Sequence, residues 1–249
     1  MKTCWLVAGP NGAGKSTLAK KYLPPECVEY VNFDDIARCN AIDGSSSNGL
    51  FRAGRIALGR IDQLIAEGRS FAIETTLSGK GHLRYVKRMK SEGWRVELHY
   101  IFIPSREFSV KRVEWRVKNG GHNVPAELVR ERYGKSLENV KVFSQLCDYT
   151  ACYDNSGGAP HFVSIRHGTD NPFVVDQEVY NLIYHGGECD KRTGVDAESK
   201  SALDVFTSSV REQLEDYSKK DAKVVVADEE RKPVVKPAKV VLDEMLQNG

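Results

Sequence analysis

Residues 9–17 constrain this chain more than any other feature of its sequence. They read Gly9-Pro10-Asn11-Gly12-Ala13-Gly14-Lys15-Ser16-Thr17, a complete G-x-x-x-x-G-K-[ST] phosphate-binding loop. An apolar stretch, residues 5–8, leads into this loop, and a helix-compatible run, residues 18–22, follows it. The motif requires this order of strand, loop and helix. The alternative interpretation is a glycine-rich turn that binds nothing.

The residue types in the loop suit a nucleoside triphosphate. Glycines let backbone N–H groups turn inward around the phosphates, and the N-terminus of the following helix adds positive potential. In such a loop the lysine, Lys15, reaches the outer phosphates, and the serine, Ser16, holds Mg²⁺. We therefore expect residues 9–17 to bind a nucleoside triphosphate together with Mg²⁺.

Length and charge limit the classes of protein that fit. A chain of 249 residues with 41% apolar residues can bury one α/β core with an appendage. Residues 187–249 hold 11 basic against 14 acidic residues, whereas the rest of the chain holds 25 against 20. The surplus of basic residues over residues 1–186 suits a phosphorylated small molecule as the partner. A protein that binds a polynucleotide usually has a denser stripe of basic residues. Nucleic acid is therefore disfavoured as a partner, though not excluded.

The cysteines and the apolar runs indicate a cellular location. The six cysteines are scattered and form no C-x-x-C pair. No signal-peptide stretch and no apolar run of membrane-spanning length accompanies them. We interpret them as reduced thiols, and we expect a cytoplasmic protein that does not associate with a membrane.

Apolar patterning predicts strands that alternate with helices. We expect strands at 29–33, 70–73 and 95–103, and helices at 50–66, at 82–92 and around Val110 to Val117. Such alternation implies an α/β fold with a parallel sheet and helices on both faces. Acidic residues follow the first two strands, at the sheet edge where open α/β sheets bind ligands: Asp34, Asp35 and Glu74.

Charge is concentrated again between residues 112 and 132. Two adjacent glycines, Gly120 and Gly121, are flanked by arginines in helix-compatible sequence. In small phosphotransferases such a segment is a mobile flap that brings guanidinium groups to the transferred phosphoryl group. A basic solvated helix with an ordinary turn is the alternative. The flap residues are Arg112, Arg116, Lys118, Gly120, Gly121, His122, Arg130 and Arg132.

Taken together, these motifs resemble the zeta-toxin family of P-loop kinases, in the bacterial branch described as zeta-toxin-like or UDP-N-acetylglucosamine kinase-like. The resemblance covers residues 1 to about 170 in order. It rests on residues 9–17, Val31-Asn32-Phe33-Asp34, Ala53-Gly54-Arg55, residues 68–79, Gly120 to Pro125, Arg130 to Tyr133, and Tyr153-Asp154-Asn155-Ser156.

The resemblance implies a fold, an activity and partners. It implies a P-loop domain over residues 1–186, similar to small-molecule kinases, with an arginine-bearing flap. It implies transfer of the ATP γ-phosphate to a sugar hydroxyl of UDP-N-acetylglucosamine or a related UDP-amino sugar. Family members deplete a peptidoglycan precursor in this way and are restrained by inhibitor proteins. We therefore expect a toxin with a possible antitoxin partner.

The resemblance also implies roles for single residues. Asp34 would orient the acceptor hydroxyl and accept its proton, with Asp35 as the competing candidate and a helix cap as the ordinary alternative. Glu74, Thr75 and Thr76 would bind the acceptor near the metal. Arg116 and Arg132 would be the catalytic flap arginines, and Arg130 would assist in substrate binding. Asn155 would lie near the adenine, although a plain turn explains it almost as well.

Residues 187–249 form a polar C-terminal extension about which the resemblance implies nothing. One amphipathic helix is expected around residues 201–217, and a stretch rich in Lys, Pro and Val follows it. Such a segment cannot build a core of its own, so we expect it to be partly helical or disordered. The alternative is a helix that packs on the kinase or recruits an inhibitor.

Three functional classes stay open at this point. The first is the UDP-amino sugar kinase, and the second is a P-loop kinase that phosphorylates another small molecule or an RNA end. The third is a nucleotide-dependent interaction protein without catalysis, which would need no acid on the acceptor side. The run Leu77-Ser78-Gly79-Lys80-Gly81 superficially resembles the signature loop of ABC-type ATPases. The next strand, however, ends without the carboxylate that those motors need.

Overall fold

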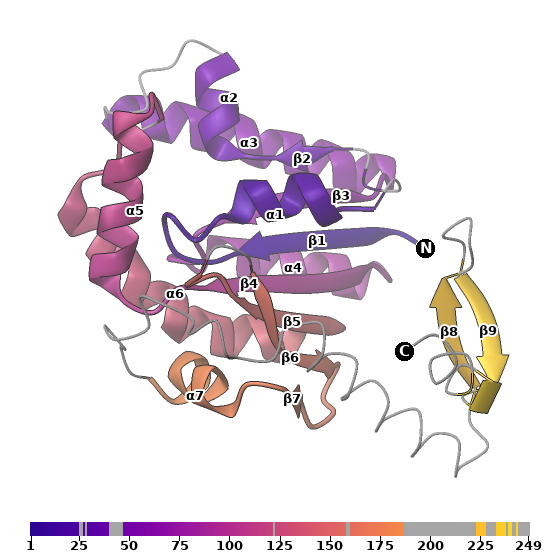
Figure 1. The fold of residues 1–249 in the computed structure, drawn as a ribbon. Helices are drawn as coiled ribbons and strands as arrows, with labels where there is room; N and C mark the ends of the chain where they lie inside the picture. The colour runs from indigo at the N-terminus through magenta and orange to yellow at the C-terminus, as the bar shows by residue number, and fades with distance from the viewer. Residues whose placement is uncertain are drawn as a thin grey trace. The chain divides into compact units, whose positions relative to one another are not determined.

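The computed structural model describes residues 1–24, 27, 29–39, 47–121, 123–157, 160–186, 223–227, 233–237, 239–240 and 243. The chain divides into two compact units, Met1–Val195 and Asp196–Gly249. The domain boundary that we expect after residue 186 stays a prediction. In the first unit (Figure 1) the elements are β1 (Thr3–Ala8), α1 (Lys15–Tyr22), β2 (Tyr30–Val31), α2 (Phe33–Cys39), α3 (Ser47–Glu67), β3 (Phe71–Thr75), α4 (Gly81–Ser91), β4 (Arg95–Phe102), α5 (Arg106–Lys118), α6 (Ala126–Leu146), β5 (Tyr149–Asp154), β6 (His161–His167), β7 (Phe173–Val174) and α7 (Gln177–His185).

A seven-stranded sheet forms the centre of this unit. Its order is β2-β3-β1-β4-β5-β6-β7, and β1 to β5 run parallel to one another. β6 runs antiparallel to both of its neighbours. All six residues of β1 are buried, as expected for a central strand covered on both faces. The predicted parallel α/β sheet is therefore confirmed, and the antiparallel β6 is an addition to it.

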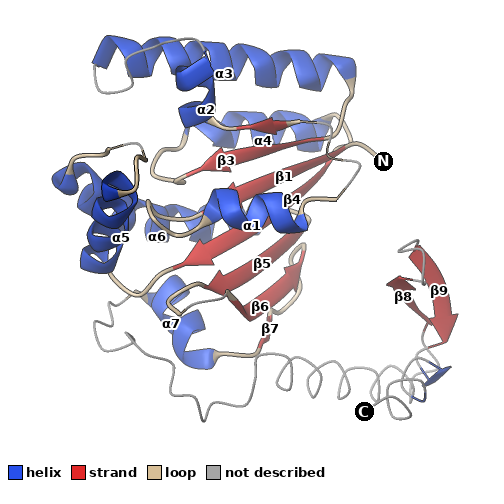
Figure 2. Cartoon of the chain, turned by 45° about the horizontal axis from the view of Figure 1, so that its top comes forward, coloured by secondary structure: helices blue, strands red, loops and turns tan. Residues whose placement is uncertain are grey.

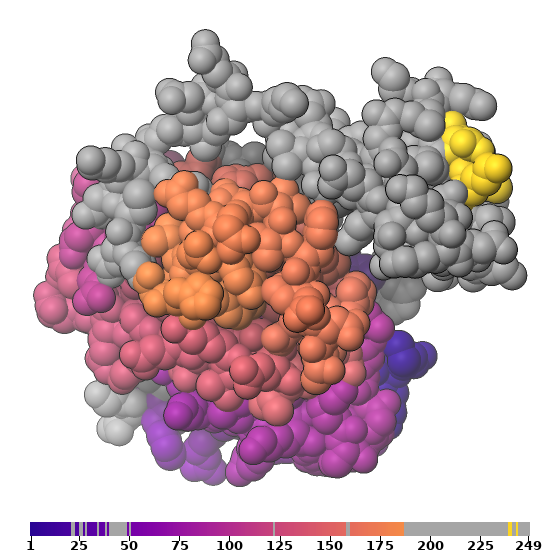
Figure 3. Space-filling view, turned by 90° about the horizontal axis from the view of Figure 1, so that it is seen from below, coloured from indigo at the N-terminus to yellow at the C-terminus, as the bar shows by residue number. Residues whose placement is uncertain are grey.

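The helices lie on both faces of the sheet. α1 covers one face, whereas α4 and α6 cover the other (Figure 2). This division follows from right-handed crossovers, because the chain moves outward from β1 to β2 through α1 and returns through the later helices. α7 packs beside α6. In the space-filling view the orange part of the chain accordingly lies against the pink part (Figure 3).

The predicted helices agree with the structure to within a few residues. α3 was expected over residues 50–66, and its fully buried residues Ala57, Ile61 and Leu64 recur at helical spacing. α4 buries Tyr85, Val86 and Met89 in the same manner. α6 and α7, together with β5 to β7, complete the fold beyond the elements predicted from the sequence.

One predicted strand is shorter than expected. The strand expected over residues 29–33 is reduced to the two residues of β2, and Phe33 already begins α2. Asn32 explains the change, because its Oδ1 accepts a hydrogen bond from the backbone N–H of Asp35 and so caps the new helix.

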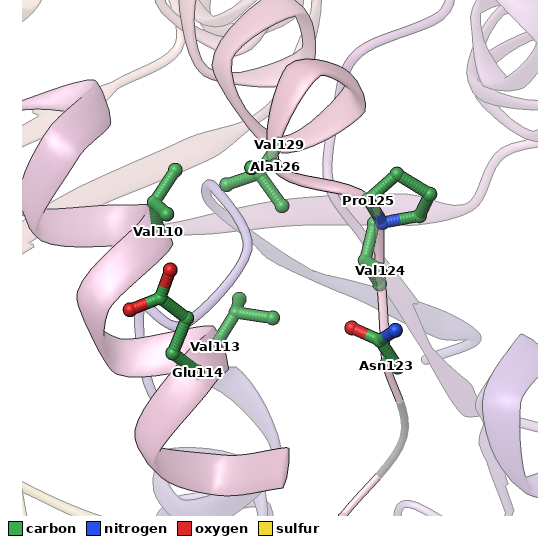
Figure 4. A pocket seen from close by; sticks show the side chains of 8 residues that line it. All are labelled: Val110, Val113, Glu114, Asn123, Val124, Pro125, Ala126 and Val129. Carbon is green, nitrogen blue, oxygen red and sulfur yellow. The ribbon is translucent and has the colours of Figure 1, made fainter.

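α5 and α6 share a small apolar cluster of their own. The cluster is separate from the main core and consists of Val110, Val113, Val124 and Val129. One turn beyond Val129 on α6, Tyr133 belongs to the main core. A cavity of about 190 Å³ lies within this small cluster (Figure 4), and it is lined by Val110, Val113, Glu114, Asn123, Val124, Pro125, Ala126 and Val129.

In the second unit, the described residues include a two-stranded antiparallel sheet. It consists of β8 (Lys223–Ala227) and β9 (Pro233–Pro237). These two strands are not among the elements expected from the sequence, although both segments contain consecutive valines, which favour strands. The amphipathic helix expected around residues 201–217 lies outside the described residues.

Candidate phosphate-binding and acceptor site

The phosphate loop joins the end of β1 to the start of α1. Its glycines Gly9, Gly12 and Gly14 have φ values of 147°, 74° and 89°, which side chains rarely adopt. Gly9 also has no room for a side chain, because a Cβ there would lie 2.2 Å from the carbonyl oxygen of Ile101. The loop therefore depends on glycine for both its backbone conformation and its contact with β4.

Side chains donate hydrogen bonds to four consecutive backbone carbonyls of the loop. The buried Lys15 donates from Nζ to the carbonyl of Pro10 at 2.9 Å. The next three carbonyls accept from outside the loop: Asn11 O from Ser109 Oγ at 2.5 Å, Gly12 O from Arg112 Nη1 at 3.4 Å, and Ala13 O from Asn155 Nδ2 at 2.8 Å.

Glu74, at the end of β3, is the centre of a polar cluster beside the loop. One carboxylate oxygen, Oε2, accepts hydrogen bonds from Ser16 Oγ at 2.7 Å and from Asn32 Nδ2 at 2.8 Å. The hydroxyl of Tyr30 donates to the same oxygen. Oε1 has no hydrogen-bond partner in the described part of the chain. The cluster thus joins the loop serine to the edge of the sheet.

Strand register explains why these side chains meet. Tyr30 pairs with Ala72 across the parallel strands, so Asn32 and Glu74 each lie two residues further along. Side chains two residues apart on a strand point to the same face. Burial and the negative charge of Glu74 both raise the pKa of the Tyr30 hydroxyl, which therefore stays protonated and continues to donate.

Asp34 lies in the first turn of α2, two residues after Asn32. Its side chain lies outside the described residues, and so does His122. The backbone nevertheless places Asp34 at the same sheet edge as Glu74, because Asn32 is hydrogen-bonded to Glu74. Its role as the base stays a prediction.

The segment after Glu74 is bound closely to its surroundings. The carbonyl of Thr75 accepts from the N–H of Gly9 at 3.3 Å, and Thr76 Oγ1 lies 2.8 Å from Ser78 Oγ. Leu77 is fully buried with φ of 56°, and Asn139 Nδ2 donates to its carbonyl at 2.8 Å. A positive φ at a non-glycine residue is strained and needs such support. Thr75 and Thr76 are therefore positioned next to the loop.

The arginines of the expected flap occupy different environments. Arg112 contacts the phosphate loop itself, and burial lowers its pKa while the charge of Asp154 opposes the shift. Arg130 pairs through two nitrogens with Glu107 and through a third with Glu127. Arg116 packs against Gly121, where a Cβ would lie 2.4 Å from the Arg116 Cγ. Arg132 lies on α6 and is partly exposed.

These positions affect the predicted roles. Arg130 would have to release Glu107 before it contacts a substrate, so its role in substrate binding stays a prediction, as do those of Arg116 and Arg132. Asn155 does lie against the phosphate loop, through Ala13, but its proximity to adenine is not tested by this contact.

Three residues near the site belong to no motif of the sequence. Tyr30 and Ser109 carry hydroxyls in ordinary apolar patterns, so no motif identifies them. His82, in the first turn of α4, packs edge-on against Phe33, and burial lowers its pKa to about 4. Its Nδ1 is buried and has no hydrogen-bond partner among the described residues.

No helix in the described part of the chain is long and apolar enough to cross a membrane. The described residues also contain no group of three or more His, Cys, Asp or Glu side chains suited to a metal ion. Ser16 suits a nucleotide-bound cation, because its hydroxyl donates its proton to Glu74 and an oxygen is the kind of ligand that Mg²⁺ prefers.

A central parallel strand that enters a G-x-x-x-x-G-K-S loop, followed by a helix, defines a P-loop protein with a kinase-like fold. The chain belongs to the AAA domain family, whose model matches residues 4–141. A protein of Haemophilus influenzae, described only as uncharacterized, is 34% identical over 125 residues, which is 50% of this chain and 88% of that protein.

Two solved structures share the fold. A crystal structure of AvrRxo1-ORF1 with ORF2 and ATP has a TM-score of 0.58 at 20% identity, over 84% of this chain and 71% of that chain. A structure from the PezAT chromosomal toxin–antitoxin system of Streptococcus pneumoniae has a TM-score of 0.54 at 17% identity, over 85% and 87%.

Proposed function

We propose that this protein is an ATP-dependent kinase of the zeta-toxin type, which transfers the γ-phosphate to a sugar hydroxyl of UDP-N-acetylglucosamine or a related UDP-amino sugar. The kinase domain spans residues 1–186 in this proposal. The observation that carries it is the hydrogen-bonded cluster of Ser16, Asn32 and Glu74. A protein that only binds a nucleotide needs the loop but has no need of an acidic residue on the acceptor side.

On the nucleotide side, the loop N–H groups and Lys15 would bind the β- and γ-phosphates of ATP. Ser16 would hold Mg²⁺, with Glu74 beside it. Mg²⁺ would neutralise the negative charge that develops on the phosphates during transfer. The hydrogen bonds from Tyr30 and Asn32 keep the Glu74 carboxylate in place for this task.

On the acceptor side, Asp34 would orient the sugar hydroxyl and accept its proton. General-base catalysis of this kind contributes about 10²–10⁴-fold. Thr75 and Thr76 would contact the acceptor from the end of β3, and Arg130 would assist them. Arg116 and Arg132 would approach the phosphoryl group when the expected flap, residues 112–132, closes.

A toxic kinase requires a restraining partner, and we propose an antitoxin or inhibitor protein for this role. Of the two structures compared above, one contains AvrRxo1-ORF1 together with ORF2, and the other comes from a toxin–antitoxin system. The expected cytoplasmic location belongs to the same proposal, because ATP and nucleotide sugars are found in the cytoplasm.

Another P-loop kinase activity is the second candidate. The same loop and Asp34 could serve a different small molecule or an RNA end. An RNA end would bind with a steep dependence on salt, because phosphate contacts release counterions, and a nucleotide sugar would not match that slope.

The experiment that tests the proposal incubates the full chain with ATP, Mg²⁺ and a panel of UDP-sugars. Mass spectrometry detects the addition of one phosphoryl group, about 80 Da, which any kinase would transfer. Lys15→Ala is the matched control. A phosphorylated UDP-N-acetylhexosamine supports the proposal. Release of ADP without a phosphorylated sugar would contradict a UDP-sugar as the acceptor but would leave the kinase activity standing. The absence of both products would contradict the kinase activity itself.

A further inference from the structure

α5 is attached directly to the phosphate loop. A Cβ on Gly12 would lie 2.9 Å from Arg112 Cβ and 3.2 Å from the carbonyl oxygen of Ser109, so the helix and the loop are in close contact there. Two side chains of α5 also hydrogen-bond to the loop, Ser109 to the carbonyl of Asn11 and Arg112 to the carbonyl of Gly12.

We propose that Ser109 and Arg112 are positioning residues: Ser109 holds the carbonyl of Asn11 outward and thereby turns the Gly12 N–H toward a bound phosphate, and Arg112 holds the carbonyl of Gly12 in place from α5. The inference rests on the proposed nucleotide-binding function of the loop. It adds that the loop takes its binding conformation only while α5 is docked against it.

Peptide geometry gives the physical reason. The C=O of one residue and the N–H of the next belong to one planar trans unit and point in opposite directions. The bond from Ser109 to Asn11 O therefore also fixes the direction of the Gly12 N–H. The bond from Asn155 to Ala13 O fixes the Gly14 N–H in the same way, from the other side of the loop.

Ser109 suits this role because it is fully buried. Water has no access to replace its hydroxyl, so its removal leaves the carbonyl of Asn11 without a partner. An unsatisfied buried acceptor costs more free energy than one hydrogen bond contributes, and the loop would relax to recover a partner.

Arg112 acts as a brace between two segments. Its guanidinium donates to the carbonyls of Gly12 at 3.4 Å and Gly157 at 3.3 Å, and it lies 4.6 Å from the centre of the Phe108 ring. No carboxylate lies within 4 Å of it in the described part of the chain. A lysine cannot replace it, because one ammonium group does not span both carbonyls as the planar fork does.

The test compares Ser109→Ala with Ser136→Ala in the full chain. Ser136 is also a fully buried serine, and its hydroxyl bonds to Tyr100 in the main core rather than to the loop. Two quantities are measured: the ATP dissociation constant by calorimetry, and deuterium uptake of the loop amides without nucleotide. We expect Ser109→Ala to weaken ATP binding roughly tenfold and to speed exchange in residues 9–17, because a buried carbonyl loses its donor.

Ser136→Ala should change neither quantity, even though it loses a comparable hydrogen bond. Unchanged ATP affinity and loop exchange in Ser109→Ala would overturn the inference. Equal effects in both variants would do the same, since they would show a general loss of stability.

Arg112→Lys provides a second variant if Ser109→Ala does not fold. It keeps the positive charge but not the fork, so we expect faster loop exchange and weaker ATP binding. Wild-type behaviour of Arg112→Lys would contradict the bracing role. If the wild-type protein itself does not bind ATP, the proposed function fails, whereas the exchange comparison still tests whether α5 orders the loop.

Discussion

Ser16 Oγ lies 2.7 Å from Glu74 Oε2, although 58 positions separate the two residues in the chain. The parallel pairing of β1 with β3 brings them together, because Val7 pairs with Glu74 one step before each strand ends. Ser16 belongs to the phosphate loop and Glu74 to the expected acceptor segment. This single hydrogen bond therefore connects the two halves of the proposed site.

Replacement of Asp34 should separate binding from catalysis. We expect Asp34→Asn to abolish phosphoryl transfer, because an amide does not accept the proton of the acceptor hydroxyl, and to leave ATP affinity nearly unchanged. Lys15→Ala should instead lose ATP binding itself. Calorimetry with ATP and the mass-spectrometric transfer assay measure the two properties. Full transfer activity in Asp34→Asn would refute its role as the base.

The hydroxyl of Tyr30 should affect the metal dependence of nucleotide binding. Tyr30→Phe keeps the ring but removes one donor to Glu74, so the carboxylate is held less firmly beside Ser16. We expect the gain in ATP affinity on addition of Mg²⁺ to fall about threefold to tenfold, with affinity in EDTA unchanged.

The control for Tyr30 is Tyr149→Phe. Tyr149 is partly buried, and its hydroxyl makes no hydrogen bond within the described residues. If both variants respond to Mg²⁺ as the wild type does, Tyr30 does not position Glu74.

Gly9 should tolerate no side chain. Gly9→Ala places a methyl group 2.2 Å from the carbonyl oxygen of Ile101, and the loop must shift to relieve the overlap. We expect a loss of about 1–3 kcal/mol or more in the free energy of unfolding, together with loss of ATP binding. Urea unfolding and calorimetry measure these quantities.

Gly134→Ala is the matched control for that substitution. Gly134 lies inside α6 with open space around it, so we expect a gain of roughly 0.5–1 kcal/mol from the higher helix propensity of alanine. Comparable stability of Gly9→Ala and the wild type would contradict the close contact between the loop and β4.

His82 should make stability depend on pH. Burial lowers its pKa from 6.5 to about 4, so the unfolded chain binds a proton at a higher pH than the folded protein does. The contribution of neutral His82 to the free energy of unfolding is therefore fully present above about pH 6.5. It is lost as the pH falls toward 4, and the loss amounts to roughly 3 kcal/mol in total. Urea unfolding between pH 7.5 and 4.5 measures this slope.

His82→Gln should remove that part of the slope, because glutamine does not titrate. The exposed His185, at the end of α7, provides the control His185→Gln, which should retain it. Parallel pH curves for His82→Gln and the wild type would show that His82 does not titrate differently in the two states.

The sequence predicts the parts of the site that local motifs determine. The loop spacing identifies Lys15 and Ser16, and the end of an apolar strand identifies Glu74 as an edge residue. The predicted parallel sheet then places Glu74 near the loop. These inferences need only local sequence and the rule that parallel strands end at one edge.

The rest depends on tertiary contacts. Tyr30 reaches Glu74 only because of the register between β2 and β3. Two residue pairs define this register. Ser109 appears in the sequence as an ordinary serine within a helix, and only the docking of α5 reveals its bond to Asn11. The pairing of Arg130 with Glu107 likewise joins two helices whose crossing no sequence pattern specifies.

The separate apolar cluster between α5 and α6 has a consequence for variation among relatives. Its four valines pack with Val117, Ala126 and Leu128 in a cluster distinct from the main core, and the change between the two clusters occurs within one turn, between Val129 and Tyr133. Residues 119–123, which contribute no described residue to either cluster, can therefore gain or lose residues while the sheet stays folded. We expect homologous proteins to differ most in length at this connection, and chimeras that exchange it to retain the wild-type unfolding midpoint.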